Sequence, residues 1–297
     1  MRSANLFLAA LALLALAACG LTSGTPASSN KIGVVAVENF WGSIAAQLGG
    51  DKVDVTSLIT NPDTDPHSYE ATPSDAKLIA TARYVIVNGA GYDPWAPKLA
   101  AANPVSGRVV LDVGVLNGVA DGGNPHMWYS PDFVTRVIDR ITSDLKRLDA
   151  ADAGYFDEQG ATYKSAGLKD YHDTIAAIKQ RYAGTPVGAS ESIFAYMSPA
   201  LGLDLITPPE YMKAISEGTD PSASDKATVD QQVASKQIKV FVFNSQNSTP
   251  DVQSLVDKAR AKGIPVVQIT ETLSPAGATF QDWQTSQLKA LLAALGG

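Results

Sequence analysis

The chain alternates short, continuous apolar runs with longer stretches of helical spacing, and this alternation sets the class of fold it can adopt. KIGVVAV at residues 31–37, YVIVN at residues 84–88 and IKVFVF at residues 238–243 are such runs. A strand without polar alternation is covered on both faces, which is typical of the parallel sheets of α/β proteins. The helical stretches supply the crossover connections that parallel strands need. The sequence therefore predicts an α/β fold with mostly parallel sheets.

The predicted strands fall into two groups, separated by a long helical region. The first group comprises residues 31–37, 53–60, 84–88 and 108–112, and the second comprises residues 186–189, 203–206, 238–243 and 264–270. Between the groups, residues 132–148 and 160–182 have helical spacing. We therefore expect an N-terminal α/β lobe at residues 31–158 and a C-terminal α/β lobe at residues 184–297, joined by a linking helix at residues 159–183.

The N-terminus, MRSANLFLAALALLALAACG, joins a positive charge at Arg2 to an apolar run over residues 6–18. This run is shorter than the roughly 20 apolar residues that span a membrane, so residues 1–18 are expected to be a secretory signal peptide. The LAAC sequence resembles a bacterial lipobox, which implies lipidation of Cys19 and anchoring to the outer face of the cell membrane, periplasmic or extracellular. Residues 19–30 are expected to form a flexible tether. The alternative is an ordinary signal peptide with an incidental cysteine.

Composition excludes several kinds of site and partner. Cys19 is the only cysteine, so neither a disulfide nor a thiolate metal site is expected. The formal net charge is −7 and no Lys/Arg-rich stretch occurs, so a nucleic-acid partner is not expected. The acidity is that of an ordinary soluble globular chain.

Four polar residues follow predicted strands closely enough to share one edge of the fold. His67 and His126 follow strands of the first group, and Glu191 and Glu271 follow strands of the second group. Ligands of open parallel sheets bind beyond the carboxyl ends of the strands. If the two lobes face each other, all four side chains converge in the cleft between them.

Two imidazoles and two carboxylates suit Zn²⁺, Mn²⁺ or Fe²⁺, and they argue against copper(I), which prefers sulfur. The two carboxylates would balance the charge of a divalent ion in a closed cleft. Monodentate carboxylates would give a tetrahedral zinc site, whereas bidentate ones would raise the coordination number and accommodate Mn²⁺.

Simpler interpretations of these residues stay open at this point. A histidine in a loop is usually a surface residue, although both His67 and His126 follow a proline, which presents the imidazole from a stiff, non-helical backbone. Glu191 could favour a helix N-terminus, and Glu271 could be an exposed loop acid. The third histidine, His172, is expected on a solvated helix face. The helix after the His67 loop is expected over residues 74–82, with Ser74 as its N-cap.

Several motifs, taken in order, resemble the zinc/manganese solute-binding lipoproteins of ABC transporters (solute-binding protein family 9). They are DPHSYEATPSD, VNGAGYDPW, NPHMWYSP, EGTDPSASD and the ITETLSP…FQDW ending, and they extend over essentially the whole chain after the tether. The resemblance implies two α/β lobes joined by a long rigid helix, with one divalent metal bound between them. It also implies that the protein delivers this metal as cargo to a membrane permease driven by an ATPase. We expect a monomer.

The resemblance also implies a ligand set. His67 matches the first ligand, in DPH, and His126 matches the second, in NPH. Glu191 falls at the third position, where zinc-type members often have His and several manganese-type members have Glu. Glu271 falls at the fourth position, where members have Asp or Glu. The residues expected to orient these ligands are Glu70, Asn124 and Gln246.

The identity of the metal stays open between Zn²⁺ and Mn²⁺. Residues 118–123 form a short segment without histidine, where many zinc-type members have a His/Asp-rich loop. Two carboxylates favour Mn²⁺, yet AVENFWGSIAAQ and NPHMWYSP are similar to members named as zinc carriers. Zinc would bind more tightly at most such sites, so affinity does not identify the physiological cargo.

Two other functions compete with metal transport. A metal-dependent hydrolase needs an open metal position and a general base, but the chain has no H-E-x-x-H motif, and four ligands fill a tetrahedral shell. A role as a surface adhesin on the same scaffold stays open as an alternative.

Overall fold

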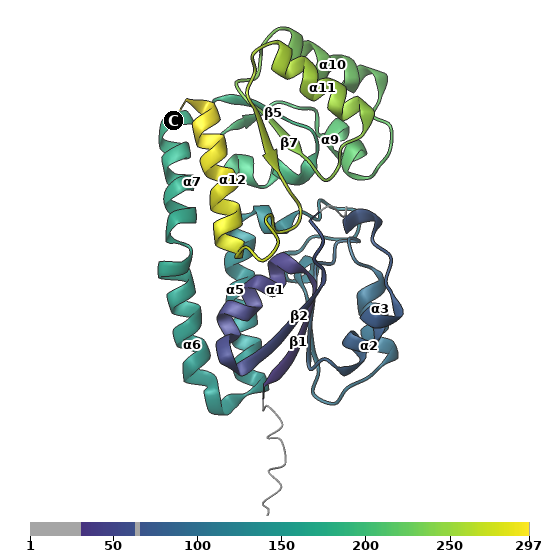
Figure 1. Ribbon diagram of the computed structural model, residues 1–297, viewed down its shortest axis with the longest axis vertical. Coiled ribbons are helices and arrows are strands. Elements are labelled where there is room, and N and C mark those ends of the chain that lie inside the picture. The colour runs from purple at the N-terminus through teal and green to yellow at the C-terminus, as the bar shows by residue number, and fades with distance from the viewer. Residues whose placement is uncertain (1–30, 63–65, 297) are drawn as a thin grey trace, which may run out of the picture. The chain divides into compact units, whose positions relative to one another are not determined.

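The first sheet has four parallel strands in the order β2-β1-β3-β4 (Figure 1). The computed structural model describes residues 31–62 and 66–296, so the predicted signal peptide, Cys19 and the tether lie outside the described residues. The strands are β1 (Ile32–Glu38), β2 (Val53–Ile59), β3 (Tyr84–Val87) and β4 (Val109–Asp112). The first predicted group of strands is therefore confirmed.

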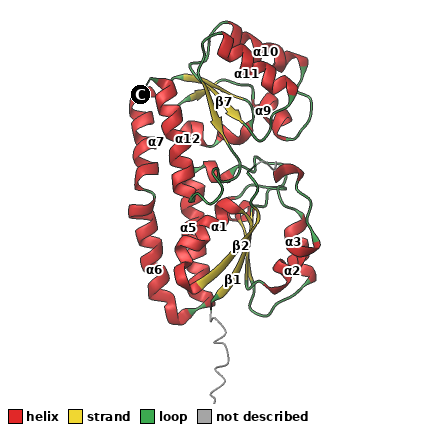
Figure 2. Ribbon diagram, in the orientation of Figure 1, coloured by secondary structure: helices red, strands yellow, loops and turns green. Residues whose placement is uncertain are grey.

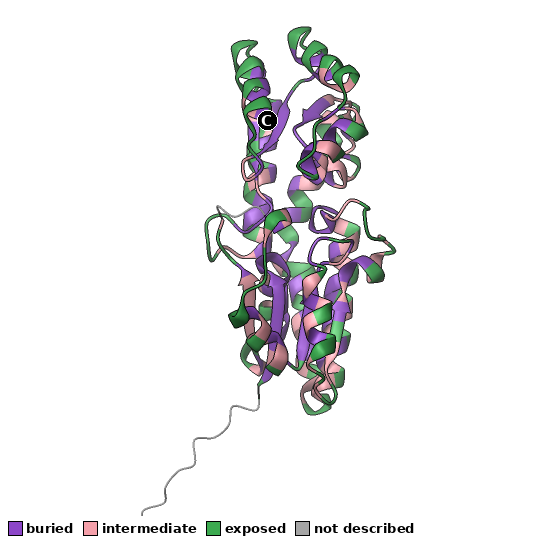
Figure 3. Cartoon of the chain, turned by 90° about the vertical axis from the view of Figure 1, so that its right-hand side faces the viewer, coloured by how far each residue is buried: buried purple, intermediate pink, exposed green. Residues whose placement is uncertain are grey.

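Helices cover both faces of this sheet, as apolar strands without polar alternation require. Val34 and Ala36 face a core that includes α1 (Asn39–Gly49), whereas Val35 and Val37 face a separate core on the other side. The helices on that other side are α2 (Pro73–Thr81) and α3 (Trp95–Ala102); the short α4 (Val113–Asn117) follows β4. The central strands β1 and β3 are almost fully buried, whereas the outer strands β2 and β4 are partly exposed; Figure 3 colours the chain by burial.

One expectation about α2 is wrong. Its N-cap is Thr72 and not Ser74, because the Thr72 hydroxyl accepts from the backbone N–H of Asp75 while the Asp75 carboxylate accepts from the backbone N–H of Thr72. This reciprocal pair is a capping box, which satisfies two backbone donors at once.

The second sheet is also parallel, in the order β6-β5-β7-β8. Its strands are β5 (Pro186–Ala189), β6 (Asp204–Leu205), β7 (Phe241–Asn244) and β8 (Val266–Ile269). The helices of this region are α8 (Met197–Ala200), α9 (Pro209–Ser216), α10 (Ala223–Ala234), α11 (Pro250–Ala261) and α12 (Phe280–Leu295). The two predicted parallel-sheet lobes are thus present (Figure 2).

A long helical segment connects the two sheets. After α5 (Pro131–Leu148) come α6 (Ala153–Thr162), a π-helical turn (Tyr163–Gly167) and α7 (Lys169–Tyr182). The backbone N–H of Leu168 donates to the carbonyl of Tyr163 at 2.9 Å, a bond that spans five residues instead of four. The segment differs from the prediction of one uniform helix over residues 160–182, because it begins earlier and contains this wider turn. α6 packs against α5, and α7 packs along α12 (Figure 1).

The chain from Lys31 onward forms one compact unit that contains both sheets. Hydrogen bonds join the two halves: Asn39 Oδ1 accepts from the backbone N–H of Leu273 at 3.2 Å, and Tyr129 donates its hydroxyl to the carbonyl of Thr270 at 2.8 Å. The lobe boundaries at residues 158/159 and 183/184 therefore stay predictions. Across residues 31–62 and 66–296, no helix has both the length and the apolar character that crossing a bilayer requires.

Candidate metal centre

Three of the four predicted ligands meet at one point. His67 Nε2 lies 3.2 Å from His126 Nε2, and Glu271 Oε2 lies 3.5 Å and 3.8 Å from these two nitrogens respectively. Within the described part of the chain, these three residues are the group of His, Cys, Asp and Glu side chains whose ligand atoms all lie within 4.8 Å of one another. Two ligands about 2.05 Å from a tetrahedral zinc ion are about 3.3 Å apart, so the spacing fits a bound transition-metal ion.

The three residues converge because each follows the carboxyl end of a strand. His67 lies in a 3₁₀ turn (Pro66–Ser68) after β2, and His126 immediately precedes a second 3₁₀ turn (Met127–Tyr129) after β4. Glu271 follows β8 of the other sheet. The carboxyl ends of the strands in both sheets therefore point toward one site, which is where parallel sheets bind their ligands.

The site is closed except at His67. The side chains of His126 and Glu271 have no exposed surface, whereas the side chain of His67 is 21% exposed. Access from solvent to the three side chains is therefore at His67, and the other two lie in surroundings from which water is largely excluded.

The His126 imidazole has a defined tautomer because Asn124 is hydrogen-bonded to its Nδ1, the nitrogen that faces away from His67 and Glu271. Asn124 Oδ1 lies 2.7 Å from His126 Nδ1, and the Asn124 amide Nδ2 donates to the carbonyl of Ser192 at 2.8 Å. The second bond fixes which end of the amide faces the histidine, so Nδ1 carries the proton and donates it to Oδ1. Nε2 then presents its lone pair to the cluster, as a metal ligand must.

Electrostatics keep the cluster ready for a cation. Burial lowers the pKa of the His126 imidazole below its usual value, against the raising effect of Glu271. Burial alone would raise the pKa of the Glu271 carboxyl, but the His126 and His67 imidazoles and the Tyr92 hydroxyl stabilise the carboxylate, and its pKa falls to about 2. The site thus combines a neutral imidazole with a permanent carboxylate at neutral pH.

Tyr92 is a site residue that sequence reasoning missed. Its hydroxyl donates to Glu271 Oε2 at 2.6 Å, and the loop before it has three successive positive φ angles, at Gly89 (71°), Ala90 (54°) and Gly91 (82°). A positive φ at Ala90 is unusual for a residue with a Cβ, and such strain is often kept at functional sites. The motif VNGAGYDPW carried the signal, because its two glycines permit this turn.

Glu191 lies beside the group of three and is not one of its members. Its Oε1 accepts from Asn244 Nδ2 at 2.7 Å, and its Oε2 accepts from Asn247 Nδ2 at 2.8 Å. The same Asn244 amide donates to Glu271 Oε1 at 2.8 Å, so one amide joins the two carboxylates. Asn244 ends β7 and directly follows the predicted strand at residues 238–243, so its position after a strand is the signal that could have found it. The assignment of Glu191 as a ligand stays a prediction.

The remaining predicted positioning residues lie in different surroundings. Gln246 Oε1 accepts from the backbone N–H of Glu271 at 2.5 Å, and its Nε2 donates to the carbonyl of Pro62 at 2.7 Å, in the segment that leads to His67. It therefore joins the backbones of two ligand segments. Glu70 is exposed, and no described hydrogen bond links it to the cluster, because the chain turns outward after the 3₁₀ turn.

Comparison with known proteins assigns the chain to a family. The family described as zinc-uptake complex component A, periplasmic (ZnuA) matches residues 34–294. The chain belongs to this family.

Relatives of the chain include carriers named for both metals. The manganese ABC transporter substrate-binding lipoprotein PsaA of Streptococcus mitis is 26% identical over 271 residues, which cover 83% of each chain. The high-affinity zinc uptake system protein ZnuA of Bacillus subtilis (strain 168) is 22% identical over 299 residues, which cover 94% of this chain and 91% of the relative. The Mn-bound periplasmic metal binding protein of Candidatus Liberibacter asiaticus shares the fold, with a TM-score of 0.74 at 20% identity over 89% of this chain and 100% of that chain.

Family membership confirms the resemblance inferred from the motifs. It favours a transport protein over the metal-dependent hydrolase that the residues alone left open, since the family consists of substrate-binding components.

Proposed function

We propose that this protein is the extracytoplasmic substrate-binding component of an ABC importer, and that its cargo is one divalent transition-metal ion, Zn²⁺ or Mn²⁺. His67, His126 and Glu271 bind the ion, and Glu191 completes the set as the fourth ligand. The protein releases the ion to a membrane permease, which an ATPase drives.

The spacing of the ligand atoms is the observation that carries this proposal. Separations of 3.2, 3.5 and 3.8 Å between two nitrogens and one oxygen match neighbouring ligands around one first-row ion. Surface histidines without a ligand role would have no reason to bring two imidazole nitrogens face to face beside a buried carboxylate, because such a group loses its hydration. One relative is named for manganese and another for zinc, which supports a divalent transition metal as the cargo.

Cys19 anchors the protein in the same proposal. Lipidation of this residue would hold the two lobes at the outer face of the membrane, next to the permease. Relatives with the word lipoprotein in their names support this placement. Replacement of Cys19 by Ser is expected to move the protein from the membrane fraction to the soluble fraction; a wild-type chain that is already soluble would contradict the anchor.

Release is expected to occur through small displacements of the ligand segments and not through wide opening of the lobes. The support is the set of bonds that tie the two halves together near the site, such as those of Tyr129 with Thr270 and of Gln246 with Pro62. Crystals of the metal-free and metal-bound forms test this idea. Superimposable loops around His67 and Glu271 in the two forms would count against it.

Metal analysis tests the cargo directly. The purified full chain is expected to contain close to one equivalent of Zn²⁺ or Mn²⁺ by elemental analysis, and competition between the two ions gives their relative affinities.

His67→Ala and His126→Ala are each expected to lower the affinity for the metal by orders of magnitude, because each removes a ligand. His172→Ala is the matched control, since His172 is exposed on α7. Equal titration curves for all four proteins would refute the ligand assignment.

A further inference from the structure

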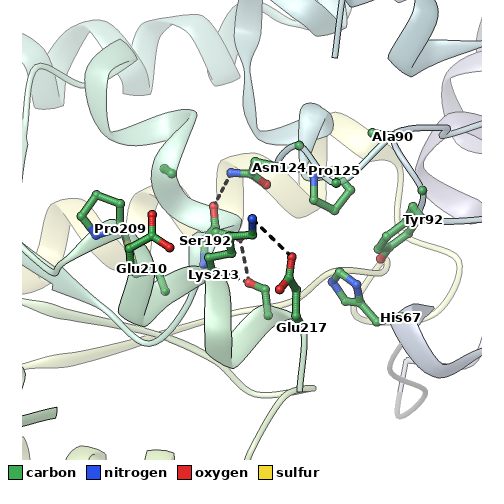
Figure 4. Close-up of a pocket in the computed structure, with 16 residues that line it drawn as sticks. His67, Ala90, Tyr92, Asn124, Pro125, Ser192, Pro209, Glu210, Lys213 and Glu217 are labelled. Atoms are coloured by element: carbon green, nitrogen blue, oxygen red, sulfur yellow. Dashed lines mark hydrogen bonds and ion pairs between the residues drawn. The ribbon is translucent and has the colours of Figure 1, made fainter. Parts of the chain in front are cut away.

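A cavity of about 330 Å³ lies directly outside the metal cluster. His67 and Tyr92 line one side of it, and α9 with the residue that follows it, Glu217, lines the other (Figure 4). Of the three clustered ligands, only His67 reaches this cavity, and it is also the only one with exposed surface. The cavity therefore meets the cluster at the one point where the cluster is accessible.

The size of the cavity suits a cation that still carries its water. Six waters around a divalent ion occupy about 180 Å³, at roughly 30 Å³ each. The cavity holds such a hydrated ion with room to spare, whereas the group of three ligands holds only the bare ion. An ion moving from one to the other must exchange its waters for protein ligands, beginning with His67.

The charges of the cavity favour a cation over an anionic chelate. α9 and its C-cap present Glu210, Lys213 and Glu217 to the cavity, at positions i, i+3 and i+7 of one helix face. Two carboxylates and one ammonium leave one negative charge in excess. Lys213 Nζ lies 3.8 Å from Glu217 Oε1, and both side chains are about half exposed, so each remains able to turn toward the cavity. Figure 4 shows the Glu217 carboxylate between Lys213 and His67.

We propose that this cavity is the access vestibule of the metal site, and that Glu217 receives the hydrated cation before His67 does. The proposal rests on the proposed function, because it assumes that the cluster binds a metal. The Lys213 ammonium repels the cation and forms an ion pair with Glu217. The two residues together therefore set the rate at which the cation enters. Once bound at the cluster, the ion no longer contacts Glu217, and the two residues govern the rates more than the equilibrium affinity.

Opposite charge changes at the two positions test the vestibule. Binding of Mn²⁺ and of Zn²⁺ by the full chain is followed by stopped-flow tryptophan fluorescence, since the ring of Trp128 lies 5.2 Å from that of His126, centroid to centroid. Glu217→Gln is expected to lower the association rate constant about threefold at low salt, and Lys213→Gln to raise it by a similar factor. Both effects should shrink as salt is added. The dissociation rate constant should move in the same direction, so that Kd changes less than either rate.

Glu158→Gln is the matched control, because Glu158 is an exposed acid on α6 whose loss changes the net charge equally without touching the cavity. Ala195→Trp narrows the cavity and should slow both association and dissociation, while circular dichroism reports an intact fold.

The outcomes separate this proposal from the proposed function. A wild-type chain that binds neither ion refutes the metal-transport function itself. A wild-type chain that binds, with association rates unchanged in the Glu217, Lys213 and Ala195 variants, refutes only the vestibule. A change in Kd carried by dissociation alone would show that Glu217 holds the bound ion instead of admitting it, which also overturns the proposal.

Discussion

At the scale of single residues, the site depends on amides as much as on its ligands. Asn124 sets the tautomer of His126, and Asn244 joins the carboxylates of Glu191 and Glu271. Amides are neutral at every pH, so they can orient charged or basic groups without competing for the cation. Mutation of the amides therefore separates orientation from ligation.

Replacement of Asn124 by Ala is expected to lower metal affinity about 10- to 100-fold, because His126 loses the acceptor that keeps its proton on Nδ1. Asn124→Asp retains an oxygen acceptor and should recover part of the loss. Competition with a chromophoric chelator measures both variants. Wild-type affinity in Asn124→Ala would show that the tautomer is fixed by another group.

The two carboxylates can be distinguished with isosteric changes. Glu271→Gln and Glu191→Gln are each expected to weaken Mn²⁺ binding by at least about tenfold, since each removes a charged oxygen ligand. Isothermal titration calorimetry checks the two variants side by side. A strong effect at Glu271 with none at Glu191 would remove Glu191 from the ligand set and leave a three-residue site.

At the scale of elements, strand ends bring polar groups together, and this also occurs away from the ligands. Glu38 ends β1 and Asp93 follows β3, and both side chains are buried. Burial, followed by the nearby Asp93 carboxyl, holds the pKa of Glu38 well above its usual value, and burial raises the pKa of Asp93 to about 6. Within the described residues, neither oxygen of Glu38 has a hydrogen-bond partner, so burial disfavours the ionised carboxylate without compensation.

Glu38→Gln is expected to stabilise the protein at neutral pH by about 1 kcal/mol, because an amide donor replaces a carboxyl that resists ionisation. A carboxyl with a raised folded-state pKa binds more protons in the folded state than in the unfolded state. For Asp93, whose folded-state pKa is about 6, this contribution is therefore lost as pH rises from about 4 through 6. Urea unfolding at pH 4.5 and pH 7.5 measures the effect. A wild-type chain that equals the variant at both pH values would contradict the raised pKa of Glu38.

The helices and strands that the sequence could predict are those with a regular pattern of apolar residues. Continuous apolar runs located both parallel sheets, and the positions just after strands located His67, His126 and Glu271. Tyr92 could not be found this way, because its role depends on a strained turn. Asn244 directly follows the predicted strand at residues 238–243 and so carried the same signal as the ligands. Thr72 displaced Ser74 as a helix cap because two backbone bonds at once outweigh one.

At the scale of the whole molecule, metal binding and pH are expected to be linked through the imidazoles. Saturating metal stabilises a binding protein by about 4 kcal/mol at 1,000 times Kd. Burial keeps the pKa of His126 below its usual value, and the pKa of Glu271 is about 2, so protons compete with the metal at His126 and not at the Glu271 carboxylate.

The gain in Tm on addition of Mn²⁺ is therefore expected to persist at pH 6 and to decline as the pH falls further, because the His126 imidazole becomes protonated. Thermal unfolding with and without Mn²⁺ at pH 8, 6 and 4.5 measures this gain. A gain that stays constant down to pH 4 would mean that His126 is not a ligand.

The π-helical turn at Tyr163–Gly167 sets how far α7 is rotated about the helix axis relative to α6, in the segment that joins the two sheets. Each α-helical residue advances the helix by about 100°, so one additional residue in a turn rotates everything that follows. The turn allows α6 to face α5 while α7 faces α12. Deletion of one residue here would restore a uniform helix and turn α7 by that angle, so that its buried face would miss α12. Adding or deleting a single residue in this segment would therefore change the orientation of one half of the metal site relative to the other.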